Sequence, residues 1–235
     1  MAVEVPANQE SATGRDRRER YGELLGAILL SFLFQGIANP GRWEQIVITV
    51  LLATTLVLAF RAANAKPRVM RFVLVVSGVV VVFSVVDSIT GNVGGAPARL
   101  ANLLLVVLAP PAIVVGVVRS LRARGGVTVE AVFGVLCLYI LLGMFFAFMY
   151  GTVDHLGQPF FAGNVQATIA KCLYYSFTTL TTVGYGDLTA ATNLGHTLSV
   201  SEALFGQIYL VTVVSVIVGN LSRARRGRGD GSGSA

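Results

Sequence analysis

The chain has 235 residues, of which 54% are hydrophobic and only 13% are charged, and its mean hydropathy is +0.71. These values exclude an ordinary soluble domain and predict a polytopic membrane protein. The net charge of +6 would suit a nucleic-acid-binding protein, but the placement of the basic residues argues against that class.

Six windows without charged residues follow one another along the chain, at residues 24–41, 45–60, 72–86, 100–118, 131–153 and 203–221. A helix needs roughly 17 to 25 residues to cross the hydrocarbon layer. Uncharged or snorkelling neighbours can complete the two shorter windows. We therefore predict an all-α membrane protein with six transmembrane helices. We expect no cleavable signal peptide, because the first apolar window follows an arginine-rich lead of about twenty residues.

The basic residues define an orientation. Fifteen of the 18 lie in four regions that alternation places on one side of the membrane, namely residues 15–20, 61–71, 119–124 and 223–228. The positive-inside rule makes this side cytoplasmic, with both termini there, and we expect a plasma-membrane location. The clusters mainly serve topology in this interpretation, with attraction to anionic inner-leaflet lipid as a secondary effect.

A polar loop separates the fifth and sixth windows. Residues 172–186 form an apolar run of about fifteen residues, too short to span with its polar second half, so it indicates a re-entrant element. Irregular backbone at membrane depth is tolerated only where protein buries it or where it lines a water-filled cavity. One loop and two helices cannot enclose such a cavity, but several copies around an axis can. The pattern therefore predicts a ring-shaped homo-oligomer with a pore on its axis.

The loop contains the sequence TVGYG at residues 182–186, in which glycines alternate with residues that carry side chains. Glycine takes a positive φ at little cost. Left- and right-handed conformations in alternation turn successive carbonyl groups toward the same side, and a column of such oxygens can replace the hydration shell of a cation. The Thr182 hydroxyl can add one more ring of oxygens at the inner end.

The residues TTVGYGD at 181–187 resemble the signature of the tetrameric potassium-channel family, and the similarity extends over residues 127–226. The resemblance implies a K⁺-selective, homotetrameric channel that conducts passively, with an outer helix, a pore helix, a selectivity filter and an inner helix. It implies K⁺ as the permeant ion and no organic cofactor. The ion sites that it implies lie in the filter, at Thr182, Val183, Gly184, Tyr185 and Gly186.

The resemblance also implies residues that support the filter. The pore helix is expected at about 166–181, with its negative dipole end toward the cavity. Tyr174 and Tyr175 stand where many family members carry two tryptophans, and we expect a cuff around the filter with the Tyr175 hydroxyl within reach of Asp187. Plain core packing is an equal alternative for Tyr174. Two threonines complete the expected support, Thr178 and Thr181; a glutamate occupies the position of Thr178 in one bacterial branch.

The inner helix is expected at about 198–222. Gly206 near its middle is either a gating hinge, as in the family, or a site of close helix packing. Glu202 is an ionisable residue at membrane depth and hence a functional candidate. Val213 and Ile217 are candidates for a hydrophobic gate, with lipid or intersubunit packing as the alternative.

The first four helices have the layout of a voltage-sensor domain, but the fourth window carries no arginine, so we expect weak voltage dependence. Pro110 and Pro111 are expected to break or kink that helix. Asp87 is a candidate partner of Arg99, as a solvated pair that contributes little. The predicted organisation is a basic segment (1–20), a four-helix domain (21–120), a pore domain (121–222) and a disordered tail (223–235).

Nothing in the sequence suggests catalysis, because no phosphate loop, metal-ligand spacing or nucleophile arrangement is visible. Cys137 and Cys172 lie in apolar surroundings and are interpreted as free, packed thiols. Two other functions stay open. A potassium-uptake transporter of related ancestry carries four degenerate filter loops in one chain, whereas this chain has one intact loop. A non-conducting regulatory subunit is disfavoured by the intact filter glycines.

Overall fold

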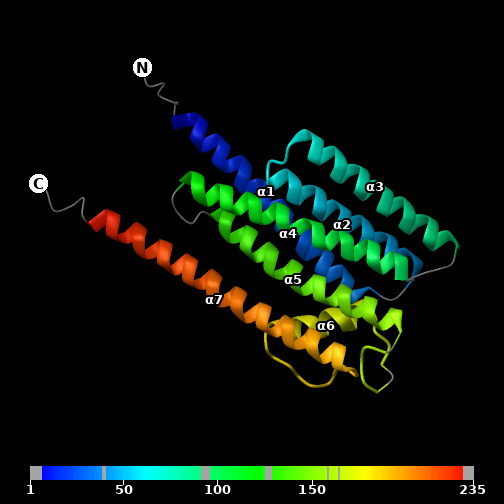
Figure 1. Ribbon diagram of the computed structural model, residues 1–235. Helices are drawn as coiled ribbons and strands as arrows, with labels where there is room; N and C mark the ends of the chain where they lie inside the picture. The colour runs from blue at the N-terminus through cyan, green and yellow to red at the C-terminus, as the bar shows by residue number, and fades with distance from the viewer. Residues whose placement is uncertain are drawn as a thin grey trace, which may run out of the picture.

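The structure is a computed structural model that describes residues 7–38, 41–90, 96–124, 129–157, 159–163 and 165–229 (Figure 1). Within these ranges the secondary structure is helical apart from one isolated β-bridge between Phe161 and Ala190. The helices are α1 (Ala7–Ile37), α2 (Arg42–Ala62), α3 (Pro67–Thr90), α4 (Ala96–Arg124), α5 (Val129–Leu156), α6 (Ile169–Leu180) and α7 (Asn193–Gly229).

Four helices among the described residues are long and apolar enough to cross a membrane. The spans are Trp43–Ala62, Pro67–Ile89, Leu100–Arg119 and Ala131–Leu156. They contain the second to fifth predicted windows, so the protein is a membrane-embedded helical protein. The first and sixth windows fall on α1 and α7, and their crossing of the membrane stays a prediction.

Helices α1 to α4 form one group and helices α5 to α7 form a second, and the two groups are in contact (Figure 1). Helix α2 packs against α1, α3 and α4, and α4 packs in turn along α5. Helix α5 also contacts α6 and α7, so it joins the first four helices to the end of the chain. The short α6 lies at one end of α5 and is contacted by α1, α5 and α7.

Helix α1 packs through a narrow stripe of buried residues. Tyr21, Leu24, Ile28, Ser31 and Gln35 are all at most 2% exposed and recur every three or four positions, which places them on one helix face. Apolar side chains on other faces, such as Leu30 and Leu33, stay exposed. The C-terminal half of α1 is therefore apolar on its outward faces as well, which suits a lipid environment.

The fourth helix continues through both of its prolines. Pro110 and Pro111 lie inside α4, so of the two predicted outcomes a break is wrong, and a kink stays a prediction. A proline in a transmembrane helix is tolerated where neighbouring helices and local adjustment compensate for the lost backbone hydrogen bond. Buried residues immediately around the prolines, Ala109, Ala112 and Ile113, show that neighbours enclose this part of α4.

A buried polar cluster joins α2, α3 and α4. The Thr49 hydroxyl lies 3.1 Å from Ser84 Oγ and 2.9 Å from Asn102 Oδ1. Asp87 is only 6% exposed, and Gln45 Nε2 donates to its Oδ2 over 3.5 Å. The expectation of a solvated Asp87 is therefore wrong, because helix packing encloses this carboxylate. The side chain of its expected partner, Arg99, lies outside the described residues.

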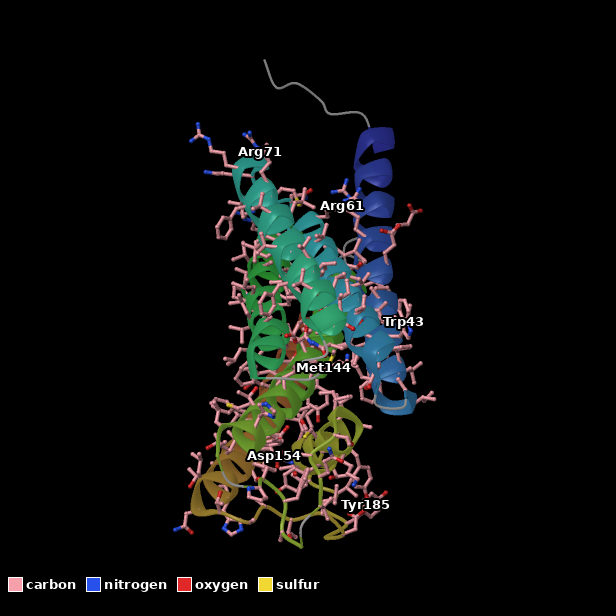
Figure 2. All side chains as sticks on the ribbon, turned by 90° about the vertical axis from the view of Figure 1, so that its right-hand side faces the viewer. Trp43, Arg61, Arg71, Met144, Asp154 and Tyr185 are labelled. Carbon is pink, nitrogen blue, oxygen red and sulfur yellow. The ribbon has the colours of Figure 1, made fainter. Side chains whose placement is uncertain are left out.

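The two ends of the molecule differ in charge and in structure. Arg61 and Arg71 lie at one end, whereas Asp154 and Tyr185 lie at the other (Figure 2). The glycine-containing loop is therefore far from the basic end of the helices, as the predicted topology requires. Cys137 and Cys172 are fully buried and form no disulfide with each other, which confirms the interpretation of packed thiols.

Candidate ion-conduction site

Helix α6 ends directly at the glycine-containing loop. It begins after Thr168, whose side chain caps the helix by accepting a hydrogen bond from the backbone N–H of Lys171 over 3.4 Å. The last residue is Leu180, and the backbone N–H of Thr181 still donates to the carbonyl of Phe177. A helix is thus present over most of the predicted range 166–181, and its C-terminal carbonyl end adjoins the loop.

Backbone hydrogen bonds hold the start of the loop against α6. The N–H groups of Val183 and Gly184 both donate to the carbonyl of Thr178, over 2.8 and 3.1 Å, and Thr182 N–H donates to the carbonyl of Thr179 over 2.9 Å. Three successive amides are therefore turned back toward the helix end. Thr178 acts here through its backbone carbonyl, while its hydroxyl donates to the carbonyl of Tyr175.

The backbone of the loop alternates in handedness. Thr182, Gly184 and Gly186 have φ values of +59°, +53° and +79°, whereas the intervening Val183 and Tyr185 do not have a positive φ. The predicted alternation is therefore present. A β-branched residue with positive φ is uncommon, so Thr182 is a strained position that the sequence did not reveal.

Gly184 and Gly186 are distinguished by their backbone conformation and not by close packing around them. A Cβ atom built on Gly184 or Gly186 meets nothing within 4 Å in this chain. The side chains around them are exposed as well, including Val183 at 53% and Tyr185 at 70%. The loop consequently offers apolar side chains that a single copy leaves largely uncovered.

The two tyrosines of α6 differ in their partners. The Tyr174 ring stacks on Tyr185, with ring centroids 6.2 Å apart and planes 5° apart, and its hydroxyl interacts with the Asp187 carboxylate. The Tyr175 hydroxyl instead lies 2.7 Å from Ser199 Oγ on α7. The expected pairing of Tyr175 with Asp187 is therefore wrong. Neighbouring residues on a helix point about 100° apart, and the loop folds back over the face that carries Tyr174.

An aromatic cluster supports the face of α6 that carries Tyr175. The Tyr175 ring contacts Tyr150, Phe160 and Phe161 edge-on, with centroids between 5.3 and 5.8 Å apart. Tyr150 and Phe160 stack at 4.4 Å. The side chains of Tyr150, Phe160 and Phe161 are among the largest fully buried ones, so this cluster is the packed core beneath α6.

The segments on either side of α6 are fastened to each other. Ala162 N–H donates to the carbonyl of Thr189 over 2.9 Å, and Ala191 N–H donates to the carbonyl of Phe160 over 2.8 Å. The His196 ring Nε2 lies 2.8 Å from the carbonyl of Ala190. The return of the chain after the loop is thus fixed, which limits how far residues 182–187 can move.

Helix α7 touches α6 and the loop at several points. A Cβ atom on Gly206 would lie 2.5 Å from the backbone oxygen of Leu180, so this glycine is a site of close packing against the end of α6. Below it, Gln207 Nε2 donates to Thr182 Oγ1 over 3.3 Å. This contact of Gln207 with the loop was not predicted from the sequence, because a glutamine after a glycine carries no recognisable pattern.

Glu202 lies behind α6 and is fully buried. The Tyr150 hydroxyl donates to Oε2 of Glu202, and Ser176 Oγ contacts Oε1. Glu202 therefore belongs to the packing around the loop and not to a gate further along α7. Of the two gate candidates there, Val213 is half-buried, and the side chain of Ile217 lies outside the described residues.

Comparison with known proteins agrees with this geometry. Residues 134–223, which include most of α5, all of α6, the loop and most of α7, match a family model described as an ion channel. A comparison with curated proteins found no match. The family match covers less than half of the chain. Together with the apolar helices, it supports a membrane-embedded protein of an ion-channel family that takes part in ion transport.

Proposed function

We propose that the protein is the subunit of a potassium-selective channel, in which residues 182–186 of four identical chains line one central pore. The observation that carries this proposal is the alternation of positive φ at Thr182, Gly184 and Gly186. This backbone can direct successive carbonyl oxygens to one side, where they replace the water around a dehydrated cation. K⁺ binds at Thr182, Val183, Gly184 and Tyr185 in this proposal, with Gly186 completing the turn.

A homotetramer explains why one chain leaves its loop uncovered. The exposed side chains of Val183 and Tyr185 would pack against neighbouring copies, since exposed apolar patches of this kind mark interfaces. A closed ring about a central axis gives each copy the same interface. In this proposal the chain crosses the plasma membrane six times, with both termini in the cytoplasm.

The test is a flux assay with the purified protein in liposomes. Vesicles loaded with K⁺ and diluted into Na⁺ buffer should release K⁺ when a protonophore compensates the charge, whereas vesicles loaded with Na⁺ should retain it. Empty liposomes and the variant Gly184→Val serve as controls. Equal release of both ions would contradict a potassium filter, and no release of either would favour a non-conducting subunit.

A further inference from the structure

A buried polar group connects three helices behind the loop. Glu202 on α7, Ser176 on α6 and Tyr150 on α5 are each 0% exposed. One carboxyl oxygen of Glu202 accepts a hydrogen bond from the Tyr150 hydroxyl, and the other contacts the Ser176 hydroxyl. A single carboxyl group on α7 is therefore joined to both other helices of the matched region.

The hydrogen bonds of Ser176 bear on the protonation state of Glu202. Ser176 Oγ lies 2.7 Å from the backbone oxygen of Gly143 on α5, in addition to its contact with Glu202. A hydroxyl carries one proton and cannot donate to both acceptors. The Gly143 carbonyl has no proton to give, so it must accept, and the contact with Glu202 then needs a proton on the carboxyl group. An ionised Glu202 would leave two acceptor oxygens facing each other.

The surroundings of Glu202 favour the neutral acid for a second reason. Among the described residues, no positively charged side chain interacts electrostatically with the Glu202 carboxyl group. Burial of an ionised carboxylate without a cationic partner is strongly unfavourable, whereas a carboxylic acid that makes both hydrogen bonds is not.

The position of α6 determines the position of the loop. Ser176 lies two residues before Thr178, whose carbonyl accepts from the amides of Val183 and Gly184. A shift of α6 would therefore move the start of the filter directly. On the other side of the group, Tyr150 stacks on Phe160 in the core beneath α6.

We propose that Glu202 is a neutral carboxylic acid that acts as a positioning residue for the filter by fastening α6 to α5 and α7. The inference rests on the proposed function. It assigns Glu202 to the support of selectivity, in place of the gating role that its depth in the membrane suggested.

Three substitutions of Glu202 distinguish a neutral acid from an ionised carboxylate and from a residue without effect on selectivity. In Glu202→Gln the amide N–H replaces the acid O–H toward Ser176, and the amide oxygen still accepts from Tyr150. We expect the K⁺ over Na⁺ permeability ratio of this variant to stay within about twofold of the wild type. In Glu202→Ala both bonds are lost, and we expect the ratio to fall about tenfold or more, since buried partners are left unsatisfied. Glu202→Asp is too short to reach both partners and should resemble Glu202→Ala.

Ser201→Ala is the matched control. Ser201 adjoins Glu202 on α7, and its hydroxyl donates back to the carbonyl of Thr197 over 2.8 Å. This variant should keep the wild-type ratio. If Glu202→Ala does not assemble, Glu202→Gln still decides, because the neutral-acid account keeps its ratio near the wild-type value, whereas an ionised carboxylate predicts a loss like that of Glu202→Asp.

An infrared difference spectrum between wild type and Glu202→Gln provides a readout that does not depend on ion flux. We expect the carbonyl band of a protonated carboxylic acid in the wild type at neutral pH and its loss in Glu202→Gln. Absence of the band, or unchanged selectivity in Glu202→Ala, would overturn the inference. A wild type that shows the band but conducts no K⁺ would contradict the proposed function and leave the neutral Glu202 in place.

Discussion

Gly186 illustrates how a single backbone angle can carry a function. Its φ is +79°, and the space around its Cβ position is open in one chain. Any effect of a methyl group there must therefore come from the conformation or from a neighbouring copy, and not from a clash inside the chain. An L-residue in this region costs roughly 1–2 kcal/mol.

We predict that Gly186→Ala abolishes conduction or removes the preference for K⁺ over Na⁺, because the carbonyl oxygens lose their common direction. The measurement is the reversal potential under opposed K⁺ and Na⁺ solutions. Gly157→Ala is the matched control, since that glycine also has open space around it but no positive φ, and it should behave as the wild type. An unchanged reversal potential in Gly186→Ala would count against the filter geometry.

Gly206 is explained better by packing than by a hinge. A methyl group there would press on the backbone of Leu180, the last residue of α6. Overpacking of this kind costs typically 1–3 kcal/mol. We predict that Gly206→Ala lowers ion selectivity or the thermal stability of the assembled protein.

The control for this prediction is Gly78→Ala on α3, where a Cβ atom meets nothing within 4 Å. It should change neither property. A shift in open probability alone, with selectivity and melting temperature unchanged in Gly206→Ala, would restore the hinge interpretation.

At the scale of elements, α4 bears on voltage dependence. The span Leu100–Arg119 carries a basic residue only at its end, and Arg119 Nη1 donates to the carbonyl of Ala63 at the end of α2 over 3.3 Å. Moving one charge through the field yields about 2.3 kcal/mol per 100 mV, and steep gating takes about three to four charges per subunit. A span with this composition cannot supply them.

We therefore predict a shallow conductance–voltage relation, worth less than about one gating charge per subunit. Weak dependence is still expected from ions that enter the filter, since they cross part of the field. The measurement is a conductance–voltage curve at fixed permeant-ion concentrations. A slope of several charges that disappears in Arg99→Gln would falsify this account of α4.

The elements near the loop show what a sequence can and cannot predict. Helix α6 was predictable to within a few residues, because the resemblance carried by TTVGYGD implies a helix directly before these residues. The partners of Tyr175 and Glu202 were not, because they depend on which faces of α6 and α7 meet. Thr182 also escaped prediction, since local hydrogen bonds to α6 impose a conformation that threonine disfavours on its own.

At the scale of the whole molecule, the uncovered loop predicts an assembly. We expect four copies of the 24.8 kDa chain in the native mass spectrum of the detergent-solubilised protein. Tyr185→Ser, which weakens the exposed apolar surface of the loop, should lower the fraction of the four-chain species, whereas Val79→Ser on the exposed face of α3 should not. A stable two-chain species that still conducts would contradict a ring of four loops.

The most direct test of the central claim, that residues 182–186 form a potassium filter, is single-channel recording in a planar bilayer with K⁺ on one side and Na⁺ on the other. We predict discrete openings whose reversal potential lies far toward the K⁺ equilibrium potential, and loss of this preference in Gly186→Ala. A reversal potential near zero, or equal currents carried by Na⁺ and K⁺ in the wild type, would contradict the account.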